Sequence, residues 1–213
     1  MASEIDICNL ALAHLGDTAT IASLSPPEGS AQAEHCARFY PVARDSLLEM
    51  HSWGFATRRV QLALLASGWP EWTYAYAQPA DALNVIAILP PESTDDYSTG
   101  VPDSAGGSYV PQPFSCEIND SGAPVIYTDQ ADAVLRYSAA VTDPTRFSPL
   151  FVMTLSWHLA SMLAGPIIKG DAGAAEAKRC AGMMQAYLSK AVESDSSQRR
   201  VRPEHVVGWM AGR

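Results

Sequence analysis

Four cysteines and five histidines are the side chains of this sequence best suited to metal binding or to nucleophilic chemistry. The cysteines form no C-x-x-C pair and the histidines no H-x-x-x-H or H-E-x-x-H pair, the spacings that bring ligands to one side of a metal ion. We therefore predict no metal site and no cofactor, and four buried free thiols rather than disulfides, as suits a reducing cytoplasm. The four cysteines are Cys8, Cys36, Cys116 and Cys180, and the five histidines are His14, His35, His51, His158 and His205.

Catalytic serines, paired carboxylates and phosphate loops are also poorly supported by the sequence. It contains no G-x-S-x-G elbow, and the two serines beside histidines, Ser52 and Ser156, fall at helical or helix-end positions. Asp95 and Asp96 belong to a loop too flexible to hold two carboxylates at the defined separation of a glycoside hydrolase. The stretch GDAGAAEAK lacks the G-K-[ST] ending of a phosphate-binding loop. We predict that the chain has no catalytic residue and is not an enzyme.

Acidic residues are concentrated in the middle of the chain. The 213 residues include 23 acids and 14 bases, for a net charge of −9. The interval between Arg59 and Arg136 holds ten acids and no lysine or arginine, so nearly all of the net charge lies there. This imbalance indicates either a separate domain or a set of solvated acidic loops within one domain. In both cases the segment should repel nucleic acid, and acidic walls let DNA slide past without adhering.

Two amphipathic helices are predicted before this middle segment. Ser3 is a helix N-cap followed by acids in the first turn, the apolar residues after it recur with helical period, and Gly16 is placed to end the helix. A second, longer helix is predicted from Ser30 to about His51. Pro41 falls inside it, and we expect this proline to bend the helix or to divide it.

Two more helices are predicted after the middle segment. Ser148 as N-cap and Pro149 at the first helical position begin one of them, and Gly165-Pro166 is predicted to end it. Asp171 then opens a last helix that reaches Ala191. No apolar run approaches the roughly 18 residues of a membrane span. The N-terminus carries acids where a signal peptide carries bases, so we expect a non-secreted protein that has no membrane association.

The middle segment has the alternation and the turn residues of short strands. The stretches WTYAYAQP, NVIAIL, PFSCEI, PVIYT and AVLRYSAAV are strand-like and are separated by turn formers. The sequence therefore predicts an α+β protein. Its expected parts are a helical bundle of residues 1–60 and 143–195, an inserted small antiparallel β domain of residues 61–142 with a long loop at 90–113, and an extended C-terminal arm of residues 196–213.

Four blocks of the sequence resemble one family of phage proteins. They are ICNLALAHLG, VARDSLLEMHSWGFA, YAYAQPADALNV and YSAAVTDPTRFSPLFVMTLSWHLASMLAG, and they fall in the family's order within residues 5–190. The chain thus resembles the tail tubular protein A family of short-tailed bacteriophages, the head-to-tail adaptor or gatekeeper. The arm after residue 195 departs from the family pattern and aligns with nothing in it.

The resemblance implies a structural virion protein rather than an enzyme. Family members form a dodecameric ring between the portal protein and the tail nozzle protein, and genomic DNA passes through the ring without specific binding. The implied location is the tail or neck of the virion, assembled in the host cytoplasm. Two alternatives from other classes stay open: a virion-associated carbohydrate or cell-wall hydrolase, and a cytoplasmic interaction module unrelated to phage.

The stretch HSWGFATRR is expected to be the joint between the helical and β parts. Trp53 and Phe55 should anchor the turn in the core, and Gly54 should allow a tight backbone. Arg58 and Arg59 are expected either to pair with acids of a neighbouring subunit or to face solvent.

Two further segments are candidates for contacts in an assembly. The acids Asp95, Asp96 and Asp103 of the long loop are expected to face the DNA channel or the nozzle. The arm combines aromatic, sulfur and guanidinium groups, which is the composition of an interface anchor, although a frayed terminus without a role is the alternative. Its candidate contacts to the portal or to a neighbouring subunit are Arg199, Arg200, Arg202, Trp209 and Met210.

Overall fold

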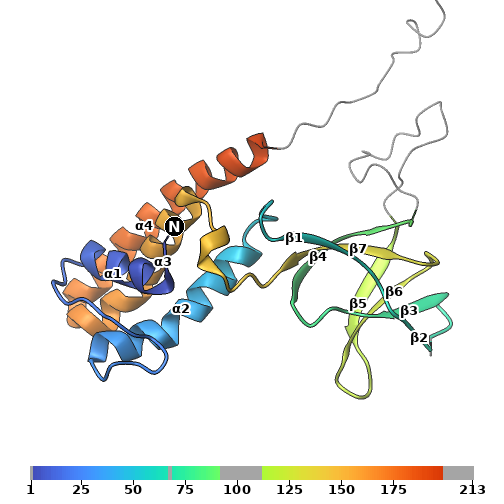
Figure 1. Cartoon of the computed structure of the whole chain (residues 1–213), viewed down its shortest axis with the longest axis horizontal. Coiled ribbons are helices and arrows are strands. Elements are labelled where there is room, and N and C mark those ends of the chain that lie inside the picture. The colour runs from blue at the N-terminus through green and yellow to red at the C-terminus, as the bar shows by residue number, and fades with distance from the viewer. Residues whose placement is uncertain (1, 67–68, 92–111, 199–213) are drawn as a thin grey trace, which may run out of the picture. The chain divides into compact units, whose positions relative to one another are not determined.

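The structure is a computed structural model that describes residues 2–66, 69–91 and 112–198 (Figure 1). These residues form four α-helices and two small antiparallel sheets, so the predicted α+β class is confirmed. The chain divides into two compact units. Of the described residues, those up to Ala56 and from Ala140 to Gln198 make the helical unit, and those from Thr57 to Ala139 make the β unit.

Helix α1 (Glu4–His14) begins and ends where its sequence predicts. The Ser3 side chain accepts a hydrogen bond from the backbone N–H of Asp6, and the Asp6 carboxylate accepts one from the Ser3 N–H in return. This reciprocal capping satisfies two N–H groups that would otherwise lack partners at the helix start. Gly16 follows the helix with φ +74°, a conformation that glycine adopts without strain.

Helix α2 (Ala31–Glu49) is a single helix that contains Pro41. Of the two outcomes expected of this proline, a bend or a division of the helix, the division is therefore wrong. Pro41 cannot donate the usual hydrogen bond to the preceding turn, but it lies on the exposed face, where water can solvate the freed carbonyl. Tyr40 and Ala43 beside it are buried, so packing of the opposite face holds both turns in place.

Helices α3 (Pro149–Ile168) and α4 (Gly170–Ser197) follow a short 3-10 turn, η1 (Pro144–Arg146). The predicted end of α3 at Gly165-Pro166 is wrong, because the helix continues to Ile168 and breaks at Lys169, whose φ is +62°. The two helices approach closely: a Cβ on Gly173 would meet the backbone oxygen of Ala164 at 3.0 Å. This packing carries α3 through its proline, and α4 also includes the first two residues of the arm predicted from 196.

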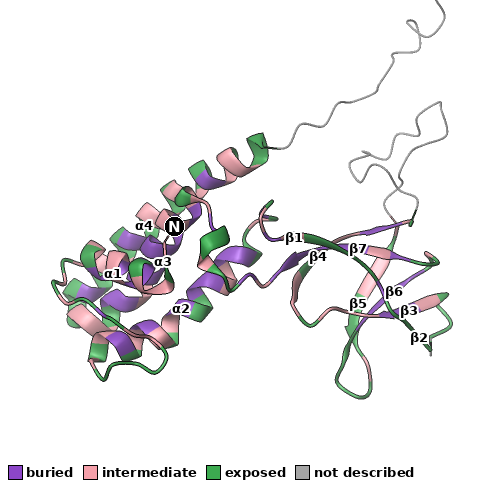
Figure 2. Ribbon diagram, in the orientation of Figure 1, coloured by how far each residue is buried: buried purple, intermediate pink, exposed green. Residues whose placement is uncertain are grey.

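Helix α3 is also the most apolar helix of the described chain. By length and composition alone it passes the test for a membrane span, with a mean hydropathy of 1.5 over its most apolar window. Nine of its residues are buried, and it contacts α1, α2 and α4. A core helix passes the same test, and the burial of α3 against three other helices accounts for its composition (Figure 2).

The β unit contains seven described strands in two antiparallel sheets, with strand orders β1-β7-β4 and β2-β3-β6-β5. The unit starts at Thr57 rather than at 61, because Thr57 already pairs with Ser138. It ends at Ala139, which is the last residue of β7 and lies a few residues before the predicted boundary at 142. The strands are β1 (Thr57–Gln61), β2 (Leu64–Leu65), β3 (Tyr74–Ala77), β4 (Ala82–Leu89), β5 (Phe114–Ile118), β6 (Pro124–Thr128) and β7 (Val134–Ala139).

Both sheets contribute to one hydrophobic core. Ile88 and Leu135 come from the three-stranded sheet, Tyr76 and Ile126 from the four-stranded sheet, and all four side chains are buried in the same cluster. The Tyr76 hydroxyl satisfies its hydrogen-bonding need by donating to the backbone oxygen of Gln130 at 2.9 Å. Two sheets that share a core leave their opposite faces free for other contacts.

Candidate interaction surfaces

The joint at the end of the helical unit is an aromatic cluster around Trp53. This side chain is fully buried, and its indole Nε1 donates a hydrogen bond to the backbone oxygen of Leu47 at 2.9 Å. Phe151 of α3 lies edge-on to Trp53 and to Phe55, with ring centroids 5.0 Å apart in both pairs. Phe147 closes the cluster against Phe55 at 5.7 Å. The cluster thus fixes residues 53–55 to the start of α3.

Gly54 lies in a tight turn, as expected, and also contacts a distant residue. The turn closes with a hydrogen bond from the Ala56 N–H to the Trp53 oxygen at 3.0 Å, and the φ of Gly54 is not positive. The Gly54 N–H donates to both carboxylate oxygens of Asp195 at 3.1 Å, and an added Cβ would lie 3.3 Å from Asp195 Oδ1. His51 Nε2 also contacts this carboxylate at 3.1 Å. Asp195 therefore joins the last turn of α4 to the joint, a role for which the sequence gives no local signal.

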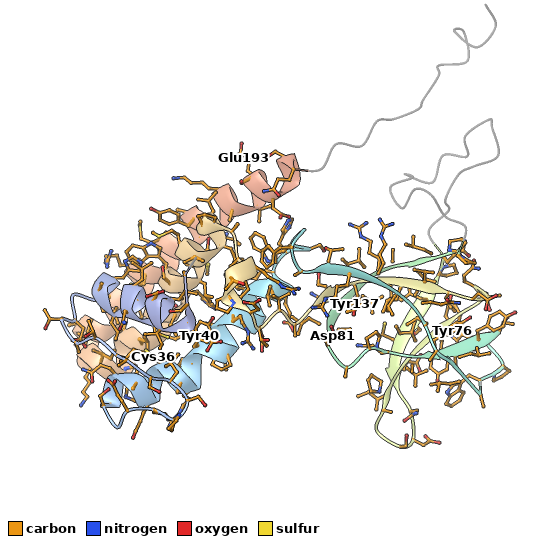
Figure 3. The ribbon with its side chains drawn as sticks, in the orientation of Figure 1. Cys36, Tyr40, Tyr76, Asp81, Tyr137 and Glu193 are labelled. Atoms are coloured by element: carbon orange, nitrogen blue, oxygen red, sulfur yellow. The ribbon has the colours of Figure 1, made fainter. Side chains whose placement is uncertain are left out.

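Arg58 has a partner within its own chain. Its Nη1 donates to Asp81 Oδ2 at 2.7 Å, and the Tyr137 hydroxyl donates to the other oxygen of the same carboxylate at 3.1 Å (Figure 3). Burial, together with this bond to Asp81, raises the pKa of Tyr137. The structure thus adds an intrachain ion pair to the two roles expected of Arg58, which were a neighbour's acid or solvent. Arg59 follows on β1 and is exposed.

A groove of about 620 Å³ crosses the face of the four-stranded sheet that is turned away from the shared core. Its floor consists of Ala75, Val125 and Tyr127, which alternate along their strands with the core residues Tyr76 and Ile126. We call it the outer groove. Its lining residues are Leu65, Ala66, Trp69, Ala75, Glu117, Ile118, Asn119, Asp120, Ser121, Val125 and Tyr127.

Large apolar side chains are exposed at the rim of the outer groove. Trp69 is 56% exposed and Ile118 is 75% exposed, while Leu65 is 38% exposed. Leu64, beside the groove on β2, is 63% exposed. Isolated exposed apolar residues are ordinary, but several of them around one hollow mark a contact site. The rim is therefore the strongest candidate contact surface of the described residues.

Carboxylates and a rigid turn supply the polar part of the same groove. The side-chain oxygen of Asn119 accepts hydrogen bonds from the backbone N–H groups of Ser121 at 3.1 Å and Ala123 at 2.9 Å, which fixes the turn between β5 and β6. Asp120 lies in this turn, and Glu117 lies on β5. Among the residues that the structure describes, the groove lining includes both carboxylates and no basic residue.

The acids of the middle segment have different roles. Asp81 holds Arg58 and Tyr137, and Asp129 accepts hydrogen bonds from the N–H and hydroxyl of Thr73, which lower the pKa of Asp129. These two acids therefore stabilise the β unit itself. The predicted channel acids Asp95, Asp96 and Asp103 lie outside the described residues, and so do the predicted arm contacts Arg199, Arg200, Arg202, Trp209 and Met210.

The thiols and imidazoles of the helical unit have packing roles. Cys8 and Cys36 are buried together, and their contact and burial raise the pKa of the Cys8 thiol, which keeps it protonated. The expectation that all four thiols are buried is wrong for Cys116, which is exposed on β5, an edge strand. His14 stacks on Trp157 with ring centroids 3.6 Å apart. Among the described residues, no three His, Cys, Asp or Glu side chains gather as they would to hold a metal ion.

Comparison with the models of known protein families and with curated proteins found no match to this chain.

Proposed function

We propose that this chain is a structural virion protein, a head-to-tail adaptor that forms a ring between the portal and the tail nozzle of a short-tailed phage. The observation that carries the proposal is the set of four ordered sequence blocks that resemble the tail tubular protein A family. In the structure these blocks fall on helices, on strands and on the two places where the chain passes between its units.

Each resembling block lies at a structurally demanding position. The first block covers α1 from Ile7 onward and the turn that follows it, and the second runs from the end of α2 through the Trp53 joint to Ala56. The third covers β3 and the start of β4. The fourth begins on β7, crosses into the helical unit and includes η1 and most of α3. Shared residues at such positions support a shared architecture, because these positions tolerate few side chains.

The distribution of contacts within the chain also supports an assembly role. A subunit of a closed ring needs two different surfaces, one for each neighbour, and further surfaces for the proteins above and below. The outer groove offers exposed apolar side chains with carboxylates beside them, which is the composition of a contact surface. The ring, its partners, its position in the neck and DNA passage through it are parts of the proposal.

The proposal is tested by asking whether the chain is part of the particle. The gene should be deleted from its phage, and particles from deleted and complemented infections should be purified and analysed by mass spectrometry and electron microscopy. We expect the chain in complemented particles at the copy number of a ring, and tailless heads that lose DNA without it. Infectious, fully tailed particles that lack this chain would refute the proposal, and so would favour a cytoplasmic interaction module.

Cleavage of carbohydrate is a second candidate, favoured by one observation. The outer groove places the aromatic rings of Trp69 and Tyr127 beside Glu117 and Asp120, and sugars bind to such combinations. Both carboxylates are exposed, however, and a general acid needs apolar surroundings that keep it protonated. Incubation of the chain with peptidoglycan and capsule should release no reducing sugar. Release that disappears in both Glu117→Gln and Asp120→Asn would establish the hydrolase instead.

A further inference from the structure

The outer groove has the form of a receptor for an apolar and cationic segment. Its floor is apolar, its rim exposes Trp69 and Ile118, and the charged residues in the described part of its lining are Glu117 and Asp120. The charge of the surrounding sequence has the same sign, because the segment from 57 to 139 contains ten acids and three arginines. A partner for this surface needs large apolar groups and positive charge close together in one short segment.

The chain itself contains a segment of this composition. The described residues end at Gln198, and the 15 residues that follow read RRVRPEHVVGWMAGR. They include four arginines against one glutamate, three valines and the pair Trp209-Met210. Arginine and tryptophan are the residues that most often dominate binding energy at interfaces. Fully extended, 15 residues span at most about 50 Å, long enough to lie across a four-stranded sheet.

We propose that the outer groove binds residues 199–213 of a second copy of this chain. In this arrangement Trp209 and Met210 pack on the apolar rim and floor, and the arginines pair with Glu117 and Asp120. The inference rests on the proposed function, because a ring requires a donor surface and a different acceptor surface on every subunit. It deepens that function by naming both surfaces of the subunit contact.

Disulfide trapping between two differently tagged full-length chains tests the proposal. Both chains carry Cys116→Ser, which removes the exposed native thiol of the described residues. One chain also carries Ala66→Cys in the groove lining, and the other carries Ala211→Cys beside Trp209-Met210. The two chains are co-expressed, oxidised and separated without reductant. We expect a band that contains both tags and that disappears on reduction.

Two controls make the trapping specific. Gln61→Cys places a thiol at an exposed position on the other sheet, and it should trap Ala211→Cys several-fold less than Ala66→Cys does. Trp209→Ala, or the triple change of Arg199, Arg200 and Arg202 to Ala, should reduce trapping at Ala66→Cys, and added salt should weaken it as it screens the charges. Trapping equal to that of the Gln61 control would overturn the proposal.

A third chain that carries both Ala66→Cys and Ala211→Cys separates the possible occupants. If its bridge forms only within one chain, the segment binds its own groove and the second-copy proposal is wrong. If particles contain a ring of this chain but no trapping occurs, the proposed function stands and only this inference fails. Trapping by a chain that is missing from purified particles would leave the self-association intact and remove the adaptor role.

Discussion

The helical unit and the β unit differ in how many large apolar side chains they leave exposed. Seven large apolar side chains are exposed among the described residues, and five of them belong to the smaller β unit. The helical unit instead joins distant parts of its sequence by specific contacts, such as that of His51 and Gly54 with Asp195. The exposed residues of the β unit are Val60, Leu64, Leu65, Trp69 and Ile118, and those of the helical unit are Val42 and Met50.

This difference suggests two roles: the helical unit is the stable body of the subunit, and the β unit carries its contact surface. A unit that buries its aromatic residues against one another and joins distant segments by side-chain contacts is stable without a partner. A unit that exposes large apolar side chains beside carboxylates offers a surface for a partner. Mutations in the two units should therefore have opposite signatures: loss of folding in the helical unit, and loss of association with normal folding in the β unit.

The largest expected effect comes from comparing two tryptophans, one from each unit. Trp53→Ala removes a fully buried ring that also donates a hydrogen bond to Leu47, and it should lower the free energy of unfolding by about 3–5 kcal/mol. Trp69→Ala removes a ring that is 56% exposed, and it should change the free energy of unfolding by no more than about 0.5 kcal/mol. Urea denaturation followed by circular dichroism at the helix band measures both. Equal losses in the two variants would contradict the division into body and contact surface.

The second effect concerns the link between α4 and the joint. Asp195→Ala removes the carboxylate that accepts hydrogen bonds from Gly54 and contacts His51, and should destabilise the helical unit by about 1–3 kcal/mol. Asp195→Asn keeps one acceptor oxygen and should cost less. Hydrogen exchange of the Gly54 amide reports this contact directly. Protection of that amide unchanged in Asp195→Ala would show that the contact has no role in stability.

A third prediction uses acidification to distinguish the two units. Burial lowers the pKa of His158 from its usual 6.5, while residues 57–139 contain no histidine. Because the unfolded state binds the proton more readily, the stabilisation from neutral His158 is lost as the pH falls through 6.5 towards the lower folded pKa. Burial lowers the pKa of His14 as well, with the same sign.

Hydrogen exchange at pH 7 and pH 5.5 measures this prediction unit by unit. The helical unit should lose protection at the lower pH and the β unit should keep it. His158→Gln should reduce the loss, since glutamine has no proton to gain. The carboxyl groups whose pKa is lowered, such as Asp129 of the β unit, lose their contribution only at still lower pH, below the usual 3.8. A β unit that opens first on mild acidification would reverse the comparison.

The smallest effect is expected at the ion pair of β1. Arg58 and Asp81 are 45% and 36% exposed, and Arg58→Ala should lower the stability of the β unit by about 0.2–1 kcal/mol. Its effect on assembly should also be small, because the guanidinium is already paired within the chain. A loss of ring formation in Arg58→Ala without a change in stability would return Arg58 to the role of a contact to a neighbouring subunit.

Local signals in the sequence were sufficient to predict most elements of the fold. Capping residues such as Ser3 and Ser148 act within one turn, so their effect is visible in a short stretch. The end of α3 could not be predicted from Gly165-Pro166, because the close packing of Gly173 against Ala164 lies in the next helix. Long-range packing of this kind overrides local stop signals.

The candidate site was less predictable than the fold. Asp195 and Gly54 are 141 residues apart in sequence, and nothing around either residue indicates the other. The outer groove combines residues from β2, β3, β5 and β6 with Trp69, and these share a face only once the strand order is known. The excess of acids predicted a distinct acidic segment, but could not distinguish Asp81, which stabilises the fold, from Asp120, which lines the groove.

The most direct test of the central claim is cryo-electron microscopy of the neck of the assembled particle. We expect a ring of copies of this chain between portal and nozzle, with each helical unit folded as it is in the isolated chain. We also expect density for residues 199–213 of one subunit in the outer groove of the next. A neck built without this chain, or a particle in which it is present only as scattered single copies, would contradict the claim.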